Sequence, residues 1–406
     1  MLKKQVIFIY MFTDRQIFYK ILAQTSANPI AIEISDAEDI FLFGTDGRKY
    51  YDLISGVSVS NAGHKNAEIN QAIIGQLDKY SHLMVYGELI QSPQVRYGEL
   101  LVSLLPENLN NVYFVNSGSE AMEGAMKLAK RYTGRTEIMA FKNAYHGSSQ
   151  GALSVLGNEK LKRSFRPLLP DIHFLNFNNA NDLRKITEKT ACVIAEPIQG
   201  EAGIILPEND FLKKLRDKCR EKGTLLIFDE VQTGICRTGR NFAFEHYDVV
   251  PDILVLAKAL GGGMPLGAFI SSKEIMQTLT SDPVLGHITT FGGHPVCCAA
   301  GMASLNFLLK NITNSETINK ADLFYSLLKD KKHVKEIRFK GLLMAIELGN
   351  SDKLQQFMRL GIEKGIISDW FLFCDTAFRI SPPLIITEEQ IREVCKIINE
   401  CLEEIK

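Results

Sequence analysis

The middle of this chain alternates short apolar runs with segments that have the length and periodicity of amphipathic helices. Six runs have the length of buried strands, at residues 112–115, 138–141, 191–195, 225–228, 253–256 and 268–270. Parallel strands need long crossover connections and are buried on both faces, so this alternation predicts an α/β fold with a mostly parallel sheet. Most of the runs lead into chemically unusual residues, at the edge where such sheets bind ligands.

The flanks of the chain have a different pattern. Residues 32–43 and 45–51 predict a strand, a turn and a second strand, with Asp46-Gly47 as the hairpin signal. Because 406 residues exceed what one hydrophobic core usually serves, we expect a large domain from residues 65–295. A smaller α+β domain would then combine both termini, residues 1–64 and 296–406.

A helix is predicted close to the carboxyl end of the chain. Thr387 and Gln390 have the spacing of a capping box, which marks a helix start. Apolar residues follow at helical intervals and predict a buried face, formed by Ile391, Val394, Cys395, Ile398, Cys401 and Leu402.

Composition excludes several classes of function. Net charge is −1, with 46 basic and 47 acidic residues, so no basic surplus indicates a nucleic-acid or anionic-membrane partner. The eight cysteines form no CxxC pair and no metal-ligand spacing with histidine; we interpret them as reduced thiols and predict no metal site. The apolar run 6–12 resembles a signal peptide but is short and lacks a cleavage site. We expect a cytoplasmic protein, with Met11 as an alternative start to Met1.

Three segments carry candidate chemistry. Gly118 follows a predicted strand and opens a predicted helix, with Ser117 and Glu120 at capping-box spacing, so its free N–H groups suit a phosphate. Asp229 ends another buried run, where a carboxylate needs a partner. Lys258 follows a third run and precedes three glycines. A lysine placed there is expected to have a lowered pKa, as Schiff-base chemistry requires. Each signal alone also fits a structural role.

In combination, these segments resemble the fold-type I enzymes that use pyridoxal 5'-phosphate (PLP), and specifically the class-III aminotransferases. The most specific motifs are residues 229–234 (DEVQTG) and 257–263 (AKALGGG), and the resemblance runs from about Pro29 to the carboxyl end. It implies a large domain with a mostly parallel central sheet, a smaller α+β domain and transamination. A PLP-dependent aminomutase or racemase, or a diaminopelargonate-type aminotransferase, remains the alternative.

The resemblance also implies roles for individual residues. Lys258 would hold PLP as a Schiff base and carry the proton during catalysis. Asp229 would keep the pyridine nitrogen protonated, and Gln232 would bind the phenolic oxygen. The other expected cofactor-binding residues are Gly118 and Ser119 at the phosphate, Tyr145 stacked on the ring, His146, Glu196 and Thr290. Thr290 lies in a segment that reaches the phosphate of a neighbouring subunit, which implies a homodimer with shared active sites. His294 stands where the family usually has asparagine.

For the substrate, the resemblance is to the acetylornithine, ornithine and 4-aminobutyrate branch. There, the residue matching Arg379 binds a substrate carboxylate, and the residue matching Glu201 pairs with it when the donor has no α-carboxylate. This implies transfer from an ω-amino donor to 2-oxoglutarate. Acetylornithine-like donors are the first candidates, with 4-aminobutyrate, ornithine and lysine after them.

Two positions depart from this branch. Ser148 replaces a second carboxylate-binding arginine, for which Arg163 or Arg166 is a candidate substitute. Val57, our remaining candidate substrate contact, replaces the tyrosine of ornithine aminotransferases. The sequence therefore leaves the donor and the pathway open, together with any assembly beyond the dimer.

Overall fold

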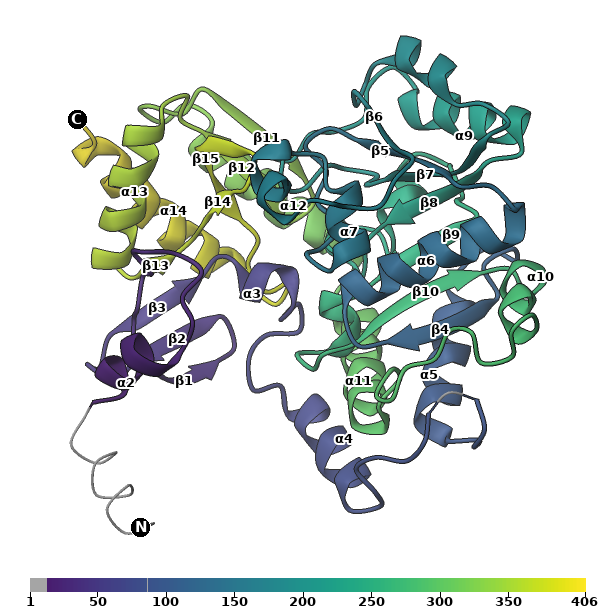
Figure 1. Ribbon diagram of the computed structural model, residues 1–406. Coiled ribbons are helices and arrows are strands. Elements are labelled where there is room, and N and C mark those ends of the chain that lie inside the picture. Colours follow the sequence, from purple (N-terminus) through teal and green to yellow (C-terminus); the bar gives the residue numbers. More distant parts are fainter. Residues whose placement is uncertain (1–12, 86) are drawn as a thin grey trace.

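The computed structural model describes residues 13–85 and 87–406; the run 6–12 and Met11 lie outside them. A seven-stranded sheet forms the centre of the molecule, in the order β4-β10-β9-β8-β7-β5-β6 (Figure 1). The six predicted strands are confirmed, and the edge strand β6 is additional. The bounds are β4 Asn111–Val115, β5 Glu137–Phe141, β6 Ile172–Leu175, β7 Thr190–Ala195, β8 Leu225–Asp229, β9 Ile253–Leu256 and β10 Gly267–Ser271.

The central sheet is mostly parallel and buries both faces. Only β10 runs antiparallel to its neighbours, β4 and β9, whereas the pairs from β9 to β6 are parallel. Along β8, Leu225 and Ile227 join one hydrophobic cluster with helix α6 (Gly118–Thr133), and Leu226 and Phe228 join another with helix α9 (Phe211–Lys222). The unbroken apolar runs follow from this two-sided burial.

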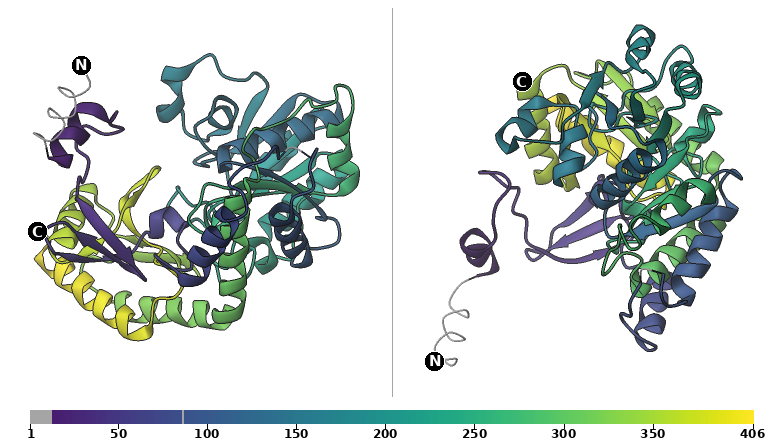
Figure 2. Two further views of the ribbon diagram at one scale, coloured as in Figure 1. Left: turned by 90° about the horizontal axis from the view of Figure 1, so that it is seen from below. Right: turned by 45° about the vertical axis from the view of Figure 1, so that its right-hand side comes forward.

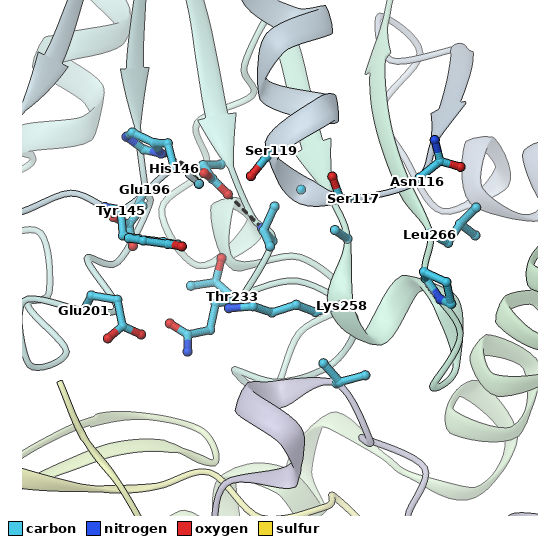
Figure 3. A pocket seen from close by; sticks show the side chains of 18 of the residues that line it. Asn116, Ser117, Ser119, Tyr145, His146, Glu196, Glu201, Thr233, Lys258 and Leu266 are labelled. Atoms are coloured by element: carbon cyan, nitrogen blue, oxygen red, sulfur yellow. Dashed lines mark hydrogen bonds and ion pairs between the residues drawn. The ribbon is translucent and has the colours of Figure 1, made fainter. Parts of the chain in front are cut away.

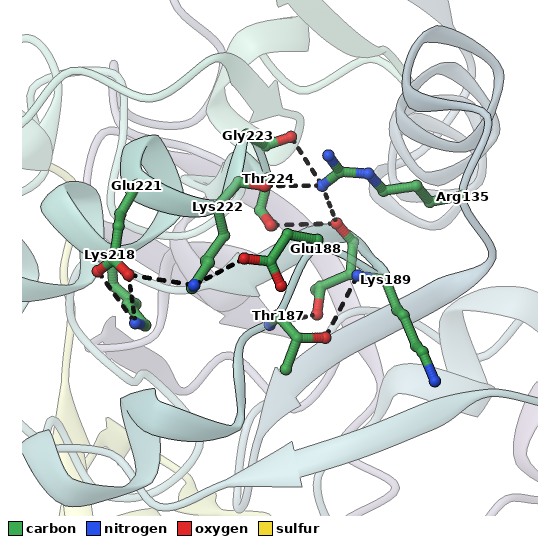
Figure 4. Close-up of polar contacts among 10 residues, drawn as sticks. Arg135, Thr187, Glu188, Lys189, Lys218, Glu221, Lys222, Gly223 and Thr224 are labelled. Carbon is green, nitrogen blue, oxygen red and sulfur yellow. Dashed lines mark hydrogen bonds and ion pairs between the residues drawn. The ribbon is translucent and has the colours of Figure 1, made fainter.

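Arg135, which lies between α6 and β5, joins two of these elements at the edge opposite the carboxyl ends of the parallel strands. Its Nη1 donates to the carbonyl oxygens of Thr190 at 3.0 Å, Lys222 at 3.0 Å and Gly223 at 2.9 Å (Figure 4). These include carbonyls at the C-terminal end of α9, which have no partner within the helix. The guanidinium therefore fixes α9 against the start of β7.

A second sheet combines both ends of the chain. Its order is β1-β2-β3-β13, with β1 Ile34–Glu38, β2 Phe41–Gly44, β3 Lys49–Asp52 and β13 Ile366–Ile367. The predicted hairpin at Asp46-Gly47 is confirmed between β2 and β3. The single strand predicted over 32–43 is wrong: it is two antiparallel strands, because the chain reverses at Asp39, whose φ is +53°.

The C-terminal part adds a third sheet and three helices, which lie with the N-terminal strands on one side of the central sheet (Figure 2). The sheet order is β11-β12-β15-β14, with β11 Glu336–Lys340, β12 Leu343–Glu347, β15 Cys374–Ile380 and β14 Trp370–Phe371. The helices are α12 Asn314–Leu328, α13 Ser351–Glu363 and α14 Glu388–Glu404. The capping box of Thr387 and Gln390 is confirmed, and so are all six buried residues predicted for α14.

Arg237 connects these parts where they meet. It is fully buried, and its Nη1 donates to the carbonyl oxygens of Leu342 at 3.0 Å and Pro382 at 2.6 Å, while Nη2 lies 3.3 Å from Ser55 Oγ. The guanidinium of Arg237, a residue of the central segment, thus contacts both the N-terminal and the C-terminal segments. The predicted domain boundaries at residues 64 and 295 stay predictions.

The remaining described α-helices are α2 Asp14–Ile21, α3 Ser55–Ser58, α4 Ala67–Leu77, α5 Ser92–Ser103, α7 Gln150–Val155, α8 Glu159–Lys162, α10 Lys273–Met276 and α11 Pro295–Asn311. All eight cysteines are free thiols. Within residues 13–85 and 87–406, no single helix is long and apolar enough to cross a membrane; α11 and α12 reach that length only together, across a 77° bend. The same residues contain no cluster of metal ligands.

Candidate active site

A pocket of about 500 Å³ lies at the carboxyl edge of the central sheet. Parallel strands bring the residues that follow them to this edge. Side chains from several strand ends point into this common space (Figure 3). The residues that line it include Asn116 to Ser119 after β4, Tyr145 to Gly147 after β5, Glu196 after β7, Asp229 at the end of β8 and Lys258 after β9.

The N-terminus of α6 forms one wall of the pocket. Ser117 caps the helix by accepting from the Glu120 N–H at 3.2 Å. The predicted capping box is only half present, because the Glu120 carboxylate instead accepts from the backbone and side-chain nitrogens of Asn116, at 2.8 Å each. The N–H groups of Gly118 and Ser119 remain in the first turn, where an anion is stabilised by these donors and by the helix dipole.

Gly147 lies against this helix start with a φ of +123°. A Cβ atom at Gly147 would stand 2.1 Å from Ser119 Oγ. Ser119 Oγ also accepts from the Ser148 N–H at 3.3 Å. The loop after β5 therefore packs closely on the α6 terminus only because residue 147 is glycine.

Asp229 is buried and has both carboxylate oxygens engaged. Its Oδ1 accepts from the Val231 N–H at 3.0 Å, and its Oδ2 lies 2.7 Å from His146 Nδ1. Burial acts to lower the pKa of His146, but the hydrogen bond to Asp229 prevails and raises it. The hydrogen bond to His146 thus fixes the Asp229 carboxylate in the pocket. A carboxylate held there could stabilise a protonated pyridine nitrogen of a bound cofactor.

Gln232 presents an unpaired amide to the same pocket. Its Nε2 is buried and has no hydrogen-bond partner among residues 13–85 and 87–406. A buried donor without a partner is costly, and a ligand oxygen would satisfy it. The nearby Glu196 is paired to backbone: it accepts from Tyr145 N–H at 3.0 Å and Gly200 N–H at 2.7 Å. Burial raises the pKa of Glu196 to about 7.

Lys258 begins a short 3₁₀ helix after β9 and has a φ of +51°. Left-handed backbone is costly for a lysine and concentrates at functional sites. Burial lowers the pKa of Lys258, and the positive charge of Arg379 adds to this effect. A larger fraction of the amine is therefore unprotonated, as an attack on a carbonyl carbon requires.

The predicted substrate residues Arg379 and Glu201 form a buried ion pair. Arg379 Nη2 donates to Glu201 Oε1 at 2.8 Å. Burial acts to raise the pKa of Glu201, but the charge of Arg379 prevails and lowers it. Glu201 lines the pocket, with Arg379 behind it. Asp369 is a second carboxylate beside the guanidinium, with its Oδ1 3.0 Å from Arg379 Nε.

Three other positions from the sequence analysis, Val57, Thr290 and His294, lie outside the pocket lining. Val57 does not line the pocket, although Val59 does. Thr290 is exposed and outside this chain's pocket. His294 caps α11, where its Nδ1 accepts from the Val296 N–H at 3.3 Å. An asparagine at this helix start would cap it in the same way.

Neither arginine proposed to replace the missing one lines the pocket. Arg166 is exposed and paired with Glu159 at 2.7 Å, and Arg163 is also outside the lining. Ser148 instead bonds to Tyr145, with 3.1 Å between the two hydroxyl oxygens. The structure thus brings together the predicted cofactor residues except Thr290, but supplies no second arginine among the described lining residues.

Sequence reasoning missed Asp369, Val59 and Thr233. Asp369 lies in a segment without a recognisable motif, and only the pairing of β14 with β15 brings it to Arg379. Thr233 belongs to the DEVQTG motif, so its proximity to the pocket could have been read from the sequence. Val59 lies two residues after the candidate Val57. The backbone at Val57 is left-handed, and only Val59 lines the pocket.

Comparisons with known proteins agree with this geometry. The family model described as "Aminotransferase class-III" matches residues 22–402. Acetylornithine aminotransferase from Methanocaldococcus jannaschii is 37% identical over 392 residues, 93% of this chain and 95% of that protein. Putrescine aminotransferase from Pectobacterium atrosepticum is 39% identical over 380 residues, 90% and 81% of the two chains. The solved ornithine aminotransferase from Toxoplasma gondii, described with PLP at its active site, superposes with a TM-score of 0.88 at 27% identity, covering 100% of this chain and 98% of the other.

Proposed function

Because this chain belongs to the class-III aminotransferases, a family of PLP-dependent enzymes, we propose that it transfers an amino group from an ω-amino donor to 2-oxoglutarate. The observation that carries this proposal is the ion pair between Arg379 and Glu201 at 2.8 Å, beside the pocket that contains the Lys258 amine. A donor without an α-carboxylate leaves this pair closed. A keto acid needs the guanidinium, which binds carboxylates bidentately.

The residues of the pocket fit PLP. The cofactor supplies an electron sink for the reacting carbon and carries the amino group between the two half-reactions. The N–H groups of Gly118 and Ser119 would bind its phosphate at the start of α6. The unpaired Gln232 Nε2 would donate to its phenolic oxygen, and Tyr145 would pack on its ring.

Two residues handle protons. The Asp229 carboxylate, held by the Val231 N–H and His146, would keep a proton on the pyridine nitrogen of PLP. The Lys258 amine, with its pKa lowered by burial, would accept the proton from the substrate carbon and return it. Glu196 and His146 hold the loop after β5 and the Asp229 carboxylate in place.

Acetylornithine-like donors are our first candidates, followed by 4-aminobutyrate, ornithine and lysine. The acetylornithine aminotransferase from M. jannaschii supports the first choice, and the putrescine aminotransferase from P. atrosepticum adds an aliphatic diamine to the set. Val57 lies outside the pocket lining, so it offers no support as a substrate contact.

A homodimer with shared sites is part of this proposal. Thr290 would reach the phosphate bound by the partner subunit, which fits its exposure and its absence from the lining of this chain's own pocket. Apolar side chains are exposed in the two segments that border a neighbouring hollow of about 580 Å³. Exposed apolar surface of this kind marks an interface. It includes Leu83, Met84, Leu89, Ile90, Val95, Val284, Leu285, Ile288 and Phe291.

The test is the visible absorbance of the PLP-loaded protein with single donors and no acceptor. N-acetylornithine, ornithine, lysine, 4-aminobutyrate and 1,4-diaminobutane are added separately. We expect one of them to discharge the cofactor band and 2-oxoglutarate to restore it. A band that no donor discharges would contradict the donor class, and a band that is discharged but not restored would contradict the acceptor.

A further inference from the structure

Arg379 is countered by two carboxylates rather than one. Its Nη2 donates to Glu201 Oε1 at 2.8 Å, and its Nε lies 3.0 Å from Asp369 Oδ1. The guanidinium carbon also lies 4.6 Å from the centre of the Phe371 ring. The arginine side chain is 1% exposed, so both carboxylates act on it with little screening by water.

The two carboxylates differ in how they are attached. Glu201 belongs to a loop of the central part of the chain and lines the pocket, so it is the carboxylate that a substrate meets. Asp369 precedes β14, and its own carbonyl oxygen accepts from the Arg379 N–H at 2.8 Å. Ser368 Oγ donates to the Arg379 carbonyl at 2.7 Å. Asp369 is therefore tied to the backbone of Arg379 itself, whereas the Glu201 carboxylate accepts from the Leu372 N–H at 3.1 Å.

Asp369 is the second carboxylate within ion-pair distance of Arg379. Burial raises the pKa of Asp369 to about 6, against the opposing charge of Arg379. The other charged groups that act on it are Glu201 and Lys258. If a substrate displaced Glu201, Asp369 would still lie beside the guanidinium.

The other lining residues provide few positive charges for a substrate carboxylate. Among the described lining residues, the basic side chains are Lys258 and His146, and the acidic ones are Glu196, Glu201 and Asp229. Lys258 is committed to the cofactor and His146 to Asp229. Recognition of a carboxylate therefore depends on Arg379, and on how far Asp369 neutralises it.

We propose that Asp369 is a specificity-determining residue that acts through Arg379: it keeps the guanidinium partly neutralised, weakens binding of α-carboxylates, and biases the pocket toward primary amines that carry no carboxylate on the reacting carbon. This inference rests on the proposed function and names a residue that determines its preference for ω-amino donors. Asp369 is a positioning residue, because it touches Arg379 rather than the pocket.

Binding of glutarate, an unreactive dicarboxylate, tests this proposal without turnover. Calorimetry is performed on the PLP-loaded wild type, Asp369→Asn and the matched control Asp375→Asn, an exposed residue at the start of β15. We expect Asp369→Asn to bind glutarate roughly fivefold more tightly, as expected for loss of one competing ion pair, and the control to match wild type. Unchanged glutarate affinity in Asp369→Asn would overturn the proposal.

A second background separates Asp369 from Glu201. In Glu201→Gln, adding Asp369→Asn is expected to give a further gain of similar size; no further gain would show that Glu201 alone controls the arginine, and would overturn the proposal. Asp369→Ala is measured in parallel, in case the asparagine variant folds poorly.

Steady-state kinetics give the matching readout. Asp369→Asn is expected to lower KM for 2-oxoglutarate while the half-reaction with the ω-amine keeps its rate. A merely structural role would change both, and that result counts against the proposal. If no ω-amine reacts with wild type, the proposed function fails, while the glutarate measurement still decides the role of Asp369.

Discussion

The backbone at Lys258 adopts a left-handed conformation that places the side chain in the pocket rather than in the sheet core. Asp229 is held differently, by one backbone N–H and one imidazole. This difference fits their predicted roles: Lys258 would transfer a proton, whereas Asp229 would keep a proton on the pyridine nitrogen. The sequence marks both positions, because a charged group at the end of a buried strand needs a partner, and the family resemblance supplies their predicted roles.

Replacing Lys258 with alanine tests the proton-transfer role. We expect Lys258→Ala to bind PLP through its phosphate and ring contacts but to lose roughly 10²- to 10⁴-fold in turnover, the usual contribution of a general acid–base group. The measurement is kcat with a reactive donor, beside cofactor content. Lys189→Ala, at an exposed position, is the control. Wild-type turnover in Lys258→Ala would contradict the central assignment.

Asp229→Asn tests the carboxylate. An amide cannot hold the ring nitrogen protonated, and His146 would lose its charged partner, so we expect kcat to fall at least about 10²-fold with the fold retained. Circular dichroism verifies folding, and Asp248→Asn, at an exposed site, should match wild type. A variant as fast as wild type would show that Asp229 has another role.

At the scale of elements, the phosphate end of the pocket depends on the contact between the loop after β5 and the start of α6. The half-formed capping box at Ser117 leaves Glu120 bonded to Asn116 instead, which ties the end of β4 to the helix. The spacing of Ser117 and Glu120 predicts both the helix start and a capping box. Only the path of the preceding strand decides which backbone nitrogen the glutamate reaches.

Gly147→Ala tests this contact. A Cβ there would lie 2.1 Å from Ser119 Oγ on a backbone with φ +123°, so Ser119 and the loop must shift. Strain of this size corresponds to roughly tenfold or more weaker PLP binding, measured by titration of the apoprotein. Gly75→Ala, where nothing lies within 4 Å of an added Cβ, should leave affinity unchanged. Equal affinities in both variants would contradict the close contact.

Strand prediction succeeded for the apolar runs of the central sheet, including the edge strand β4, and failed at the edge strand β6 and in residues 32–43. The six runs of the central sheet are apolar at nearly every position, because helices cover both faces. The edge strand β6 contains the exposed His173 and has no such run. Residues 32–43 read as one strand, since their pattern carries no signal for the reversal at Asp39.

At the scale of the whole molecule, the carboxyl-terminal strand β13 pairs with β3 across more than 300 residues. This pairing brings the C-terminal sheet, with Arg379, beside the pocket formed by the central sheet. Arg237 then ties the parts together through buried hydrogen bonds to Leu342, Pro382 and Ser55. The substrate end of the site therefore exists only in the complete fold.

Ile90→Asp tests the homodimer. Ile90 is 97% exposed, so a charge there leaves the fold of one subunit intact but would have to be buried in a dimer. We expect dimer dissociation to increase on the order of tenfold or more, with weaker PLP binding because Thr290 of the partner subunit is withdrawn. Sedimentation measures the assembly, and Leu161→Asp, at an exposed site on α8, is the control. An unchanged dimer would remove Ile90 from the interface.

The sequence by itself determined where the cofactor side of the pocket lies: the strand ends and the α6 terminus follow from local burial patterns, so short-range information was sufficient. The roles of Asp229, Gln232 and Lys258 follow from the family resemblance and stay predictions. The substrate side was decided by tertiary structure. Asp369 carries no motif, and its position beside Arg379 depends on strand pairing between distant segments. A contact made across a sheet is a property of register and packing, which no local pattern specifies.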